Sequence, residues 1–145
     1  MMGAAVTARD DLLRRAIELA ATARKSGNPP FGSLLAGPDG TVIAEDHNTS
    51  ITDNDISAHP ELKLAKWAAA NLDPETAAGT TMYTSCQPCG MCAGAIARSG
   101  LGHVVYALSG DQLNALKPGG SFPAVPQEGP NLYDEARVPV DGYYN

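Results

Sequence analysis

The sequence predicts one α/β domain, in which helices alternate with short strands and pack on a sheet. The chain has 145 residues, the usual size of a single compact domain. Its hydrophobic fraction of 43% and charged fraction of 18% are ordinary for a globular protein. Runs of helical periodicity alternate along the chain with short β-prone runs, which is typical of layered α/β domains.

The first third of the chain predicts a helix followed by a β-hairpin. Thr7 can cap a helix that begins near Ala8, and apolar residues recur at helical spacing until Gly27 ends it. After two prolines, the β-prone runs 31–37 and 41–48 are separated by the turn residues Gly-Pro-Asp-Gly. We expect these runs to pair as an antiparallel hairpin.

Helices and strands continue to alternate after a polar loop at 48–58. An alanine-rich helix is expected from the segment His59-Pro60-Glu61 to about Asn71, because proline suits a first helical position. The elements expected after it are a strand at 80–84, a turn at 86–88, a helix from Cys89 to Arg98 closed by Gly100, a strand at 103–108 and a short helix at 109–116.

Residues 117–145 form a distinct C-terminal segment. Five prolines and four glycines predict irregular structure here. Aromatic residues at Phe122, Tyr133, Tyr143 and Tyr144 are more than a disordered tail usually contains. We therefore expect this segment to be ordered and to pack on the domain or on a partner subunit.

Charge and composition limit the partners of the chain. The formal net charge is -6, and Lys and Arg do not cluster as they do in proteins that bind a phosphate backbone, so a polynucleotide is not expected. No apolar run approaches the ~20 residues of a membrane span, and the N-terminus lacks the features of a secretory signal. Three cysteines within a short stretch fit metal ligation in a reducing compartment. We expect a soluble cytoplasmic protein.

Three residues are candidate zinc ligands: His59, Cys89 and Cys92. A catalytic zinc site has three protein ligands and an open fourth position for water. Cys89 and Cys92 are three residues apart at a helix start, so their thiolates face one side and are favoured by the helix N-terminus. Glu61 lies two residues after the histidine, where it can reach a bound water without being a ligand. His-x-Glu followed by Pro-Cys-x-x-Cys is the zinc deaminase signature.

The stretch from about residue 30 to 108 resembles the cytidine deaminase superfamily, and within it the branch of guanine deaminases and tRNA adenosine deaminases. The motifs that carry the resemblance are NPPFG, His59-Pro60-Glu61 and TSCQPCGMCAGAI. The resemblance implies a three-layer α/β/α sandwich with a mixed central sheet of about five strands. It also implies a homodimer.

By position in these motifs, the resemblance assigns His59, Cys89 and Cys92 as zinc ligands and Glu61 as the proton shuttle. It also implies substrate contacts from Asn48, Phe31 and Pro88. Departures from the family pattern occur where Pro60, Gln87 and Gly90 stand in place of alanine, glutamate and proline. None of these departures removes a ligand or the proton shuttle.

The implied activity is zinc-dependent hydrolytic removal of an exocyclic amino group, as ammonia, from a nucleobase or nucleoside, with a guanine-like purine favoured. Glu61 would take a proton from water, pass it to a ring nitrogen and later protonate the leaving ammonia. The C-terminal segment would help to close the active site or simply cover a sheet edge.

Two alternative functions remain open. A tRNA adenosine deaminase fits the same motifs, although the acidity of the chain opposes it. A non-catalytic zinc-stabilised module would use Cys86 as a fourth ligand in a closed site. We expect Cys86 instead to be a small buried residue near the pocket, because it precedes the turn on the strand side.

Overall fold

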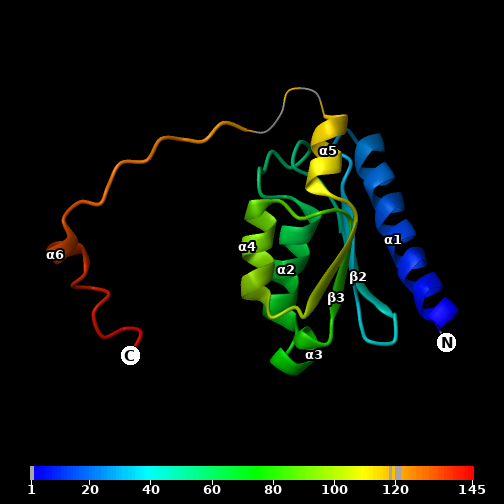
Figure 1. The fold of residues 1–145 in the computed structure, drawn as a ribbon, viewed down its shortest axis with the longest axis horizontal. Helices are drawn as coiled ribbons and strands as arrows, with labels where there is room; N and C mark the ends of the chain where they lie inside the picture. Colours follow the sequence, from blue (N-terminus) through cyan, green and yellow to red (C-terminus); the bar gives the residue numbers. More distant parts are fainter. Residues whose placement is uncertain (1, 118, 120–121) are drawn as a thin grey trace.

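The structure is a computed structural model that describes residues 2–117, 119 and 122–145. It has three layers, with α1 (Met2–Lys25) on one face of a sheet and α2 (Pro60–Asn71) and α4 (Gly90–Ser99) on the other (Figure 1). The sheet has four strands in the described part of the chain, where about five were expected. The predicted α/β/α sandwich with a mixed sheet is confirmed.

The strand order brings four chain segments to one end of the sheet. The order is β2-β1-β3-β4, and the strands are β1 (Gly32–Ala36), β2 (Val42–His47), β3 (Thr81–Cys86) and β4 (His103–Leu108). β1 pairs antiparallel with β2 and β3, as the predicted hairpin requires, while β3 and β4 are parallel and are joined through α4. The pairs Gly32 with His47 and Cys86 with Leu108 therefore lie at the same end of the sheet.

The central strand β1 is buried along its whole length and packs closely on α1. A Cβ atom at Gly32 would lie 2.5 Å from the backbone carbonyl of Ala16 and from the backbone nitrogen of Ala20, so only glycine permits this approach. On the opposite face, Leu35 and Met82 of the sheet pack against the α2 side chains Leu64 and Ala68. This core fixes α2 on the sheet.

The helices differ from the sequence predictions mainly at their ends. α1 begins at Met2 and passes through Thr7, so the expectation of a cap at Thr7 is wrong, because the preceding alanine-rich residues continue the helix. α4 ends, as predicted, at Gly100, which has a φ of 88°. α5 (Gly110–Leu116) is capped by Ser109.

Two short helices were not predicted, namely α3 (Pro74–Ala78) and α6 (Tyr133–Ala136). α3 follows Asp73, whose side chain accepts a hydrogen bond from the backbone of Thr76, and the Asp-Pro pair was its signal in the sequence. Over the residues that the structure describes, no helix is both long and apolar enough to cross a membrane.

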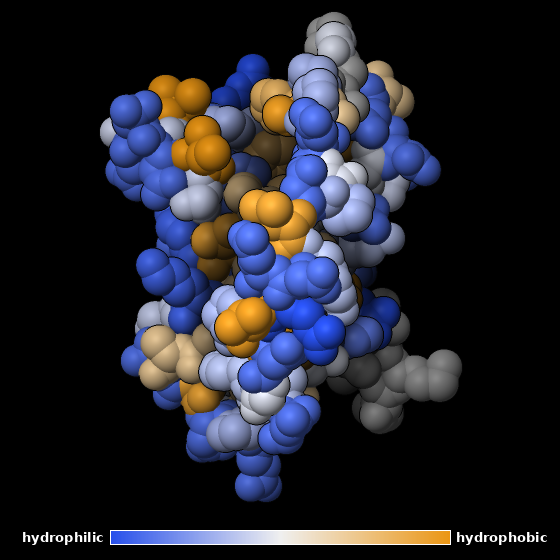
Figure 2. All heavy atoms as spheres, turned by 90° about the vertical axis from the view of Figure 1, so that its left-hand side faces the viewer, coloured by the Kyte–Doolittle hydropathy of each residue, from blue (hydrophilic) through white to orange (hydrophobic). Residues whose placement is uncertain are grey.

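The C-terminal segment extends away from the three layers (Figure 1). Every residue from 122 to 145 is exposed, and α6 is a single turn within this stretch. Its exposed apolar side chains are Phe122, Val125, Leu132, Tyr133, Val138, Val140, Tyr143 and Tyr144. Viewed from the side of this segment, the molecule shows apolar groups exposed among polar ones (Figure 2). Its packing on a partner subunit stays a prediction.

Candidate active site

His59, Cys89 and Cys92 come together although 30 residues of chain separate the first two. The Nδ1 atom of His59 lies 3.8 Å from the Sγ atom of Cys89 and 3.4 Å from that of Cys92. The three ligand atoms all lie within 4.8 Å of one another. One metal ion can therefore contact all three side chains.

Two helix N-termini build this group. His59 is the N-cap residue of α2, and Cys89 is the N-cap residue of α4. Neither side chain makes a capping hydrogen bond, so both are free to face the site. Cys92 follows in the first turn of α4 and is buried. Since α2 and α4 pack side by side, both positive helix ends lie near the thiol groups.

The donor set fits zinc. One imidazole nitrogen and two thiol sulfurs are ligands that zinc prefers, and three protein ligands leave a fourth position open. Burial raises the pKa of the Cys92 thiol, and the nearby charge of Glu61 raises it further. A bound divalent cation reverses this preference, because it stabilises the thiolate. Burial also lowers the pKa of His59, which favours the neutral imidazole that binds metal.

Glu61 stands beside this group with an unsatisfied oxygen. Its side chain is buried, and the residue is only 5% exposed. In the part of the chain that the structure describes, its Oε1 atom is the buried side-chain atom without a hydrogen-bond partner. Burial raises the pKa of this carboxyl to about 7. A buried acceptor of this kind requires a partner such as water or a ligand.

Cys86 lies outside the group of three that the described residues form. It is the last residue of β3 and is buried, as the sequence predicted. Burial raises the pKa of its thiol. The geometry therefore favours an open three-ligand site over a closed one with Cys86 as the fourth ligand.

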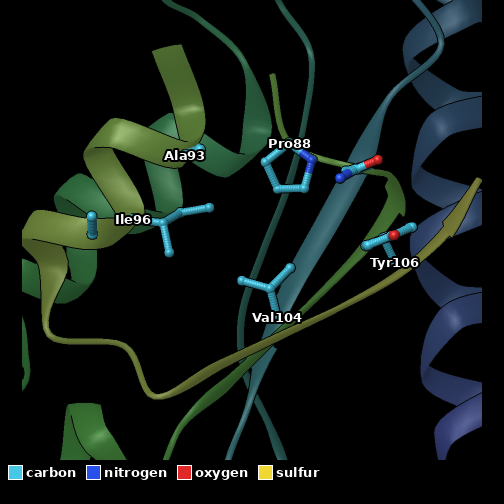
Figure 3. Close-up of a pocket in the computed structure, with 7 residues that line it drawn as sticks. Pro88, Ala93, Ile96, Val104 and Tyr106 are labelled. Carbon is cyan, nitrogen blue, oxygen red and sulfur yellow. The ribbon is translucent and has the colours of Figure 1, made fainter. Parts of the chain in front are cut away.

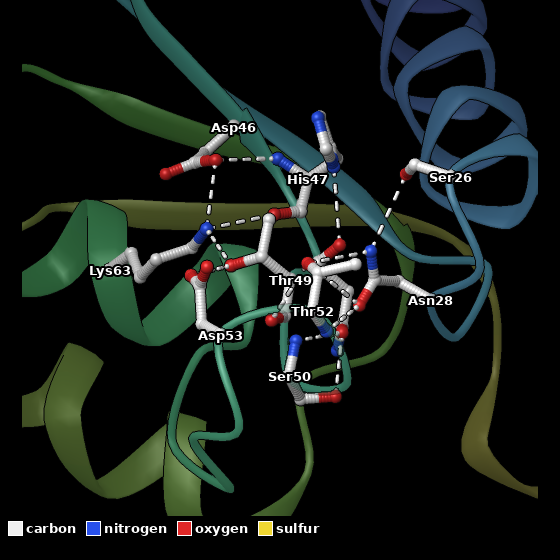
Figure 4. A network of polar contacts seen from close by, with 10 residues as sticks. Ser26, Asn28, Asp46, His47, Thr49, Ser50, Thr52, Asp53 and Lys63 are labelled. Atoms are coloured by element: carbon white, nitrogen blue, oxygen red, sulfur yellow. Dashed lines mark hydrogen bonds and ion pairs between the residues drawn. The ribbon is translucent and has the colours of Figure 1, made fainter.

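Asn48 and Phe31 are adjacent at the same end of the sheet. The backbone N–H of Asn48 donates to the carbonyl of Phe31 at 3.0 Å, and Asn48 is 1% exposed. Its Oδ1 atom accepts from the backbone N–H and from the hydroxyl of Ser50, both at 2.8 Å (Figure 4). Since a backbone N–H can only donate, Oδ1 must face Ser50. The amide Nδ2 is then the atom that Asn48 can offer to another partner.

Pro88 directly precedes the candidate ligand Cys89 in the chain. It lines a groove of about 350 Å³ between α4 and β4, together with Gln87, Ala93, Ile96, Ala97, Val104 and Tyr106 (Figure 3). Neither Asn48 nor Phe31 lines this groove. The structure thus brings together two of the three predicted substrate contacts.

Asn28 is a residue of the site region that the sequence analysis missed. Its Oδ1 atom accepts from the backbone N–H groups of Ile51 and Thr52, at 3.0 and 3.1 Å. Its Nδ2 atom donates to the hydroxyl of Thr52 at 3.1 Å. Asn28 therefore holds the loop that follows Asn48, and its only signal in the sequence was its place at the start of the NPPFG motif.

Gln87, which departs from the family pattern, also has a clear contact. Its Oε1 atom accepts from the backbone N–H of Gly110 at 2.9 Å, at the start of α5. A glutamate oxygen can accept the same bond, so the amide keeps this connection without a negative charge.

Comparison with known proteins agrees with this geometry. Residues 6–108 match the family described as "Cytidine and deoxycytidylate deaminase zinc-binding region". The solved structure of guanine deaminase from Bacillus subtilis superposes with a TM-score of 0.74 at 30% identity, covering 93% of this chain and 92% of that one.

Curated relatives have several different names. A tRNA(Ile)-lysidine synthase of Deinococcus deserti is 32% identical over 92% of this chain, which spans 26% of that relative. A tRNA-specific adenosine deaminase of Haemophilus influenzae is 33% identical over 74% of this chain, which spans 62% of that relative. A probable cytosine deaminase of Schizosaccharomyces pombe is 32% identical, covering 92% of this chain and 90% of its own length.

The chain therefore spans less than two thirds of some of these relatives, and their named substrates include tRNA as well as free bases. The tRNA-specific relative weakens the expectation that a polynucleotide is not a partner. The family match covers more than half of the chain and includes all three candidate ligands and Glu61. The chain belongs to the cytidine and deoxycytidylate deaminase family, a zinc-binding family of hydrolases that act on carbon–nitrogen bonds.

Proposed function

We propose that this chain is a zinc-dependent hydrolytic deaminase that releases ammonia from the exocyclic amino group of a nucleobase or nucleoside. The observation that carries the proposal is the buried Oε1 atom of Glu61, which has no partner among the described residues. A structural zinc site has no use for such a carboxylate, whereas a hydrolytic site needs a proton carrier at this place.

The residues of the chain divide the chemistry between them. His59, Cys89 and Cys92 would hold a zinc ion, whose positive charge would make water more acidic. Glu61 accepts a proton from water and delivers it to a ring nitrogen of the substrate. The water oxygen bonds to the ring carbon that carries the amino group. Glu61 then takes up the second proton of this water and passes it to the amino group, the C–N bond breaks, and ammonia leaves. The Nδ2 group of Asn48 donates a hydrogen bond that orients the ring.

A guanine-like purine is the favoured substrate. The similarity to the guanine deaminase structure extends over almost the whole length of both chains, which supports this choice. A tRNA adenosine deaminase is the second candidate, favoured by the named relative of Haemophilus influenzae. The net charge of -6 opposes tight binding to a phosphate backbone.

The C-terminal segment, residues 117–145, completes the proposal. We propose that it covers the site of a partner subunit in a homodimer. Its aromatic and aliphatic side chains are exposed in the single chain, and it extends away from its own three layers (Figure 1). Burying such a set of side chains against another subunit removes apolar surface from water.

The test is ammonia release by the zinc-loaded protein from a panel of purine and pyrimidine bases and nucleosides. Turnover of a free purine, lost in Glu61→Gln with zinc retained, supports the proposal. Inosine formation in tRNA without turnover of any free base would favour the second candidate. Zinc binding without turnover of either substrate class would leave only the non-catalytic module.

A further inference from the structure

The side chain of Lys63 donates hydrogen bonds to residues on both sides of Asn48 (Figure 4). Its Nζ atom donates to the carboxylate of Asp46 at 3.0 Å and to the backbone carbonyl of His47 at 2.9 Å. It also donates to the hydroxyl of Thr49 at 3.0 Å. A lysine ammonium has three N–H donors, and here each has an acceptor. The ammonium group is therefore fixed in position.

The bonds continue from Thr49 into the following loop. The Thr49 hydroxyl donates to the carboxylate of Asp53 at 2.6 Å. The Thr49 backbone N–H donates to the carbonyl of Ala58 at 3.1 Å, and Ala58 directly precedes His59. Both ends of the loop are thus tied to the segment that contains Asn48.

Lys63 also belongs to the helix that presents the other site residues. α2 has His59 at its N-cap and Glu61 in its first turn. The backbone N–H of Lys63 donates a hydrogen bond to the backbone carbonyl of His59 at 3.0 Å. The field of the helix disfavours a positive charge this close to its N-terminus. The acceptors around Asn48 compensate for that cost.

We infer that Lys63 is a positioning residue, which fixes Asn48 relative to Glu61 and the metal ligands. The inference rests on the proposed function, because it takes Asn48 as a substrate contact and Glu61 as the proton carrier. The competing explanation is an ordinary ion pair between Lys63 and Asp46, whose side chains are 27% and 34% exposed. An ion pair requires only the Asp46 carboxylate, whereas the other two acceptors are uncharged groups that flank Asn48.

The experiment is a double-mutant cycle with Lys63→Met and Asn48→Ala, in the zinc-loaded protein and with the best substrate of the panel. Lys63→Met keeps the aliphatic stem and removes the three donors. We expect KM to rise about 5- to 30-fold, as loss of one or two kcal/mol predicts. The value of kcat stays near that of the wild type, because Asn48 binds the ground state and the transition state alike. Lys66→Met, an exposed position on the same helix, is the matched control and leaves both constants unchanged.

The decisive result is the effect of Lys63→Met when Asn48 is already alanine. A residue that acts through Asn48 adds nothing in that background, whereas independent structural damage adds its full effect. Additive losses, or an unchanged KM in the single variant, would overturn the inference. If Lys63→Met loses zinc or its cooperative melting transition, Thr49→Val removes one acceptor and must give a smaller KM rise that also vanishes with Asn48→Ala. A wild type without turnover would instead refute the proposed function, and the inference with it.

Discussion

The loop at 48–58 and the segment at 117–145 are both irregular, but they differ in how they contact the rest of the chain. Residues outside the loop hold it by hydrogen bonds, from Asn28 on one side and Lys63 on the other. The contacts of the C-terminal segment are local, such as the ion pair of Arg137 with Asp141 at 2.9 Å. Local contacts leave its apolar side chains exposed.

This difference shows that composition alone does not decide which irregular segment is fixed. The loop exposes its large apolar side chains, Ile51 and Ile56, and is nevertheless held in place by polar contacts. The C-terminal segment has many apolar side chains, and they are exposed because the segment extends away from the three layers. Hydrogen bonds can fix a loop within one chain, whereas apolar burial requires a second surface.

Glu61→Gln is expected to have the largest effect. It leaves the loop at 48–58 and the segment at 117–145 unchanged, so it is the reference for the variants in those two regions. We expect turnover to fall by about 10² to 10⁴, because the amide cannot carry a proton. Zinc content, measured by elemental analysis, and the melting temperature stay near those of the wild type. Retained turnover would remove Glu61 from the mechanism.

Asn28→Ala tests whether polar contacts hold the loop. We expect the free energy of unfolding to fall by about 1–3 kcal/mol in urea denaturation, because a buried hydrogen-bonding group is removed. Asn28→Asp is the matched control, since its carboxylate still accepts from the backbone N–H groups of Ile51 and Thr52, and it loses less stability. Equal losses in the two variants would show that the acceptor is unimportant.

Deletion of residues 141–145 tests the other segment. These residues are exposed, so the melting temperature and zinc content stay unchanged. We expect turnover to fall about ten-fold, which corresponds to a loss of roughly 1.4 kcal/mol in the free energy with which the segment covers the bound substrate. Unchanged turnover would exclude a lid role for Tyr143 and Tyr144.

A mixing experiment sharpens this test by asking which chain supplies the segment. The truncated chain keeps Glu61, and Glu61→Gln keeps the segment. Mixed under conditions that exchange subunits, the two regain turnover if the segment covers a partner's site. Turnover equal to the average of the separate proteins would instead indicate that each segment serves its own chain.

The smallest expected effect is the pH response of the loop at Asp55. A side-chain hydrogen bond from Ser57 and a backbone hydrogen bond from the same residue lower the pKa of Asp55. Because the pKa of Asp55 is lowered in the folded state, the contact with Ser57 stabilises the fold at pH values above the ordinary aspartate pKa of 3.8. This stabilisation is lost as the pH falls through the lower pKa of the folded state. The protection of loop amides against hydrogen exchange, relative to the intrinsic exchange rate at each pH, should fall from pH 5 to 3 (about the range of aspartate titration). Asp55→Asn should abolish this pH response.

The sequence could predict the elements that depend on local signals. The hairpin, the strand at 103–108 and the end of α4 at Gly100 follow from alternation, turn residues and a glycine stop. The start of α1 could not be placed, because Thr7 is a good cap, whereas the residues before it mix good helix formers such as Ala4 and Ala5 with a poor one, Gly3.

For the site, spacing predicted that Cys89 and Cys92 would share a helix face, and the structure brings His59 to them. The roles of Asn28 and Lys63 could not be predicted in the same way. Asn28 contacts residues 23 and 24 positions away, and Lys63 contacts one 17 positions away. No local pattern encodes such polar contacts between different elements, since they depend on how the helices pack on the sheet.

The use of two N-cap positions by His59 and Cys89 sets stability against function. Serine, aspartate and asparagine are the residues that stabilise a helix most at this position, typically by about 1 kcal/mol over residues that do not cap. Both helices forgo that gain, because neither cap side chain makes a capping hydrogen bond and both belong to the group of candidate metal ligands. Selection for thermal resistance alone would favour better capping residues at these two positions, and metal binding would then be lost. The persistence of histidine and cysteine at these two positions in a thermally selected library would therefore report selection for activity.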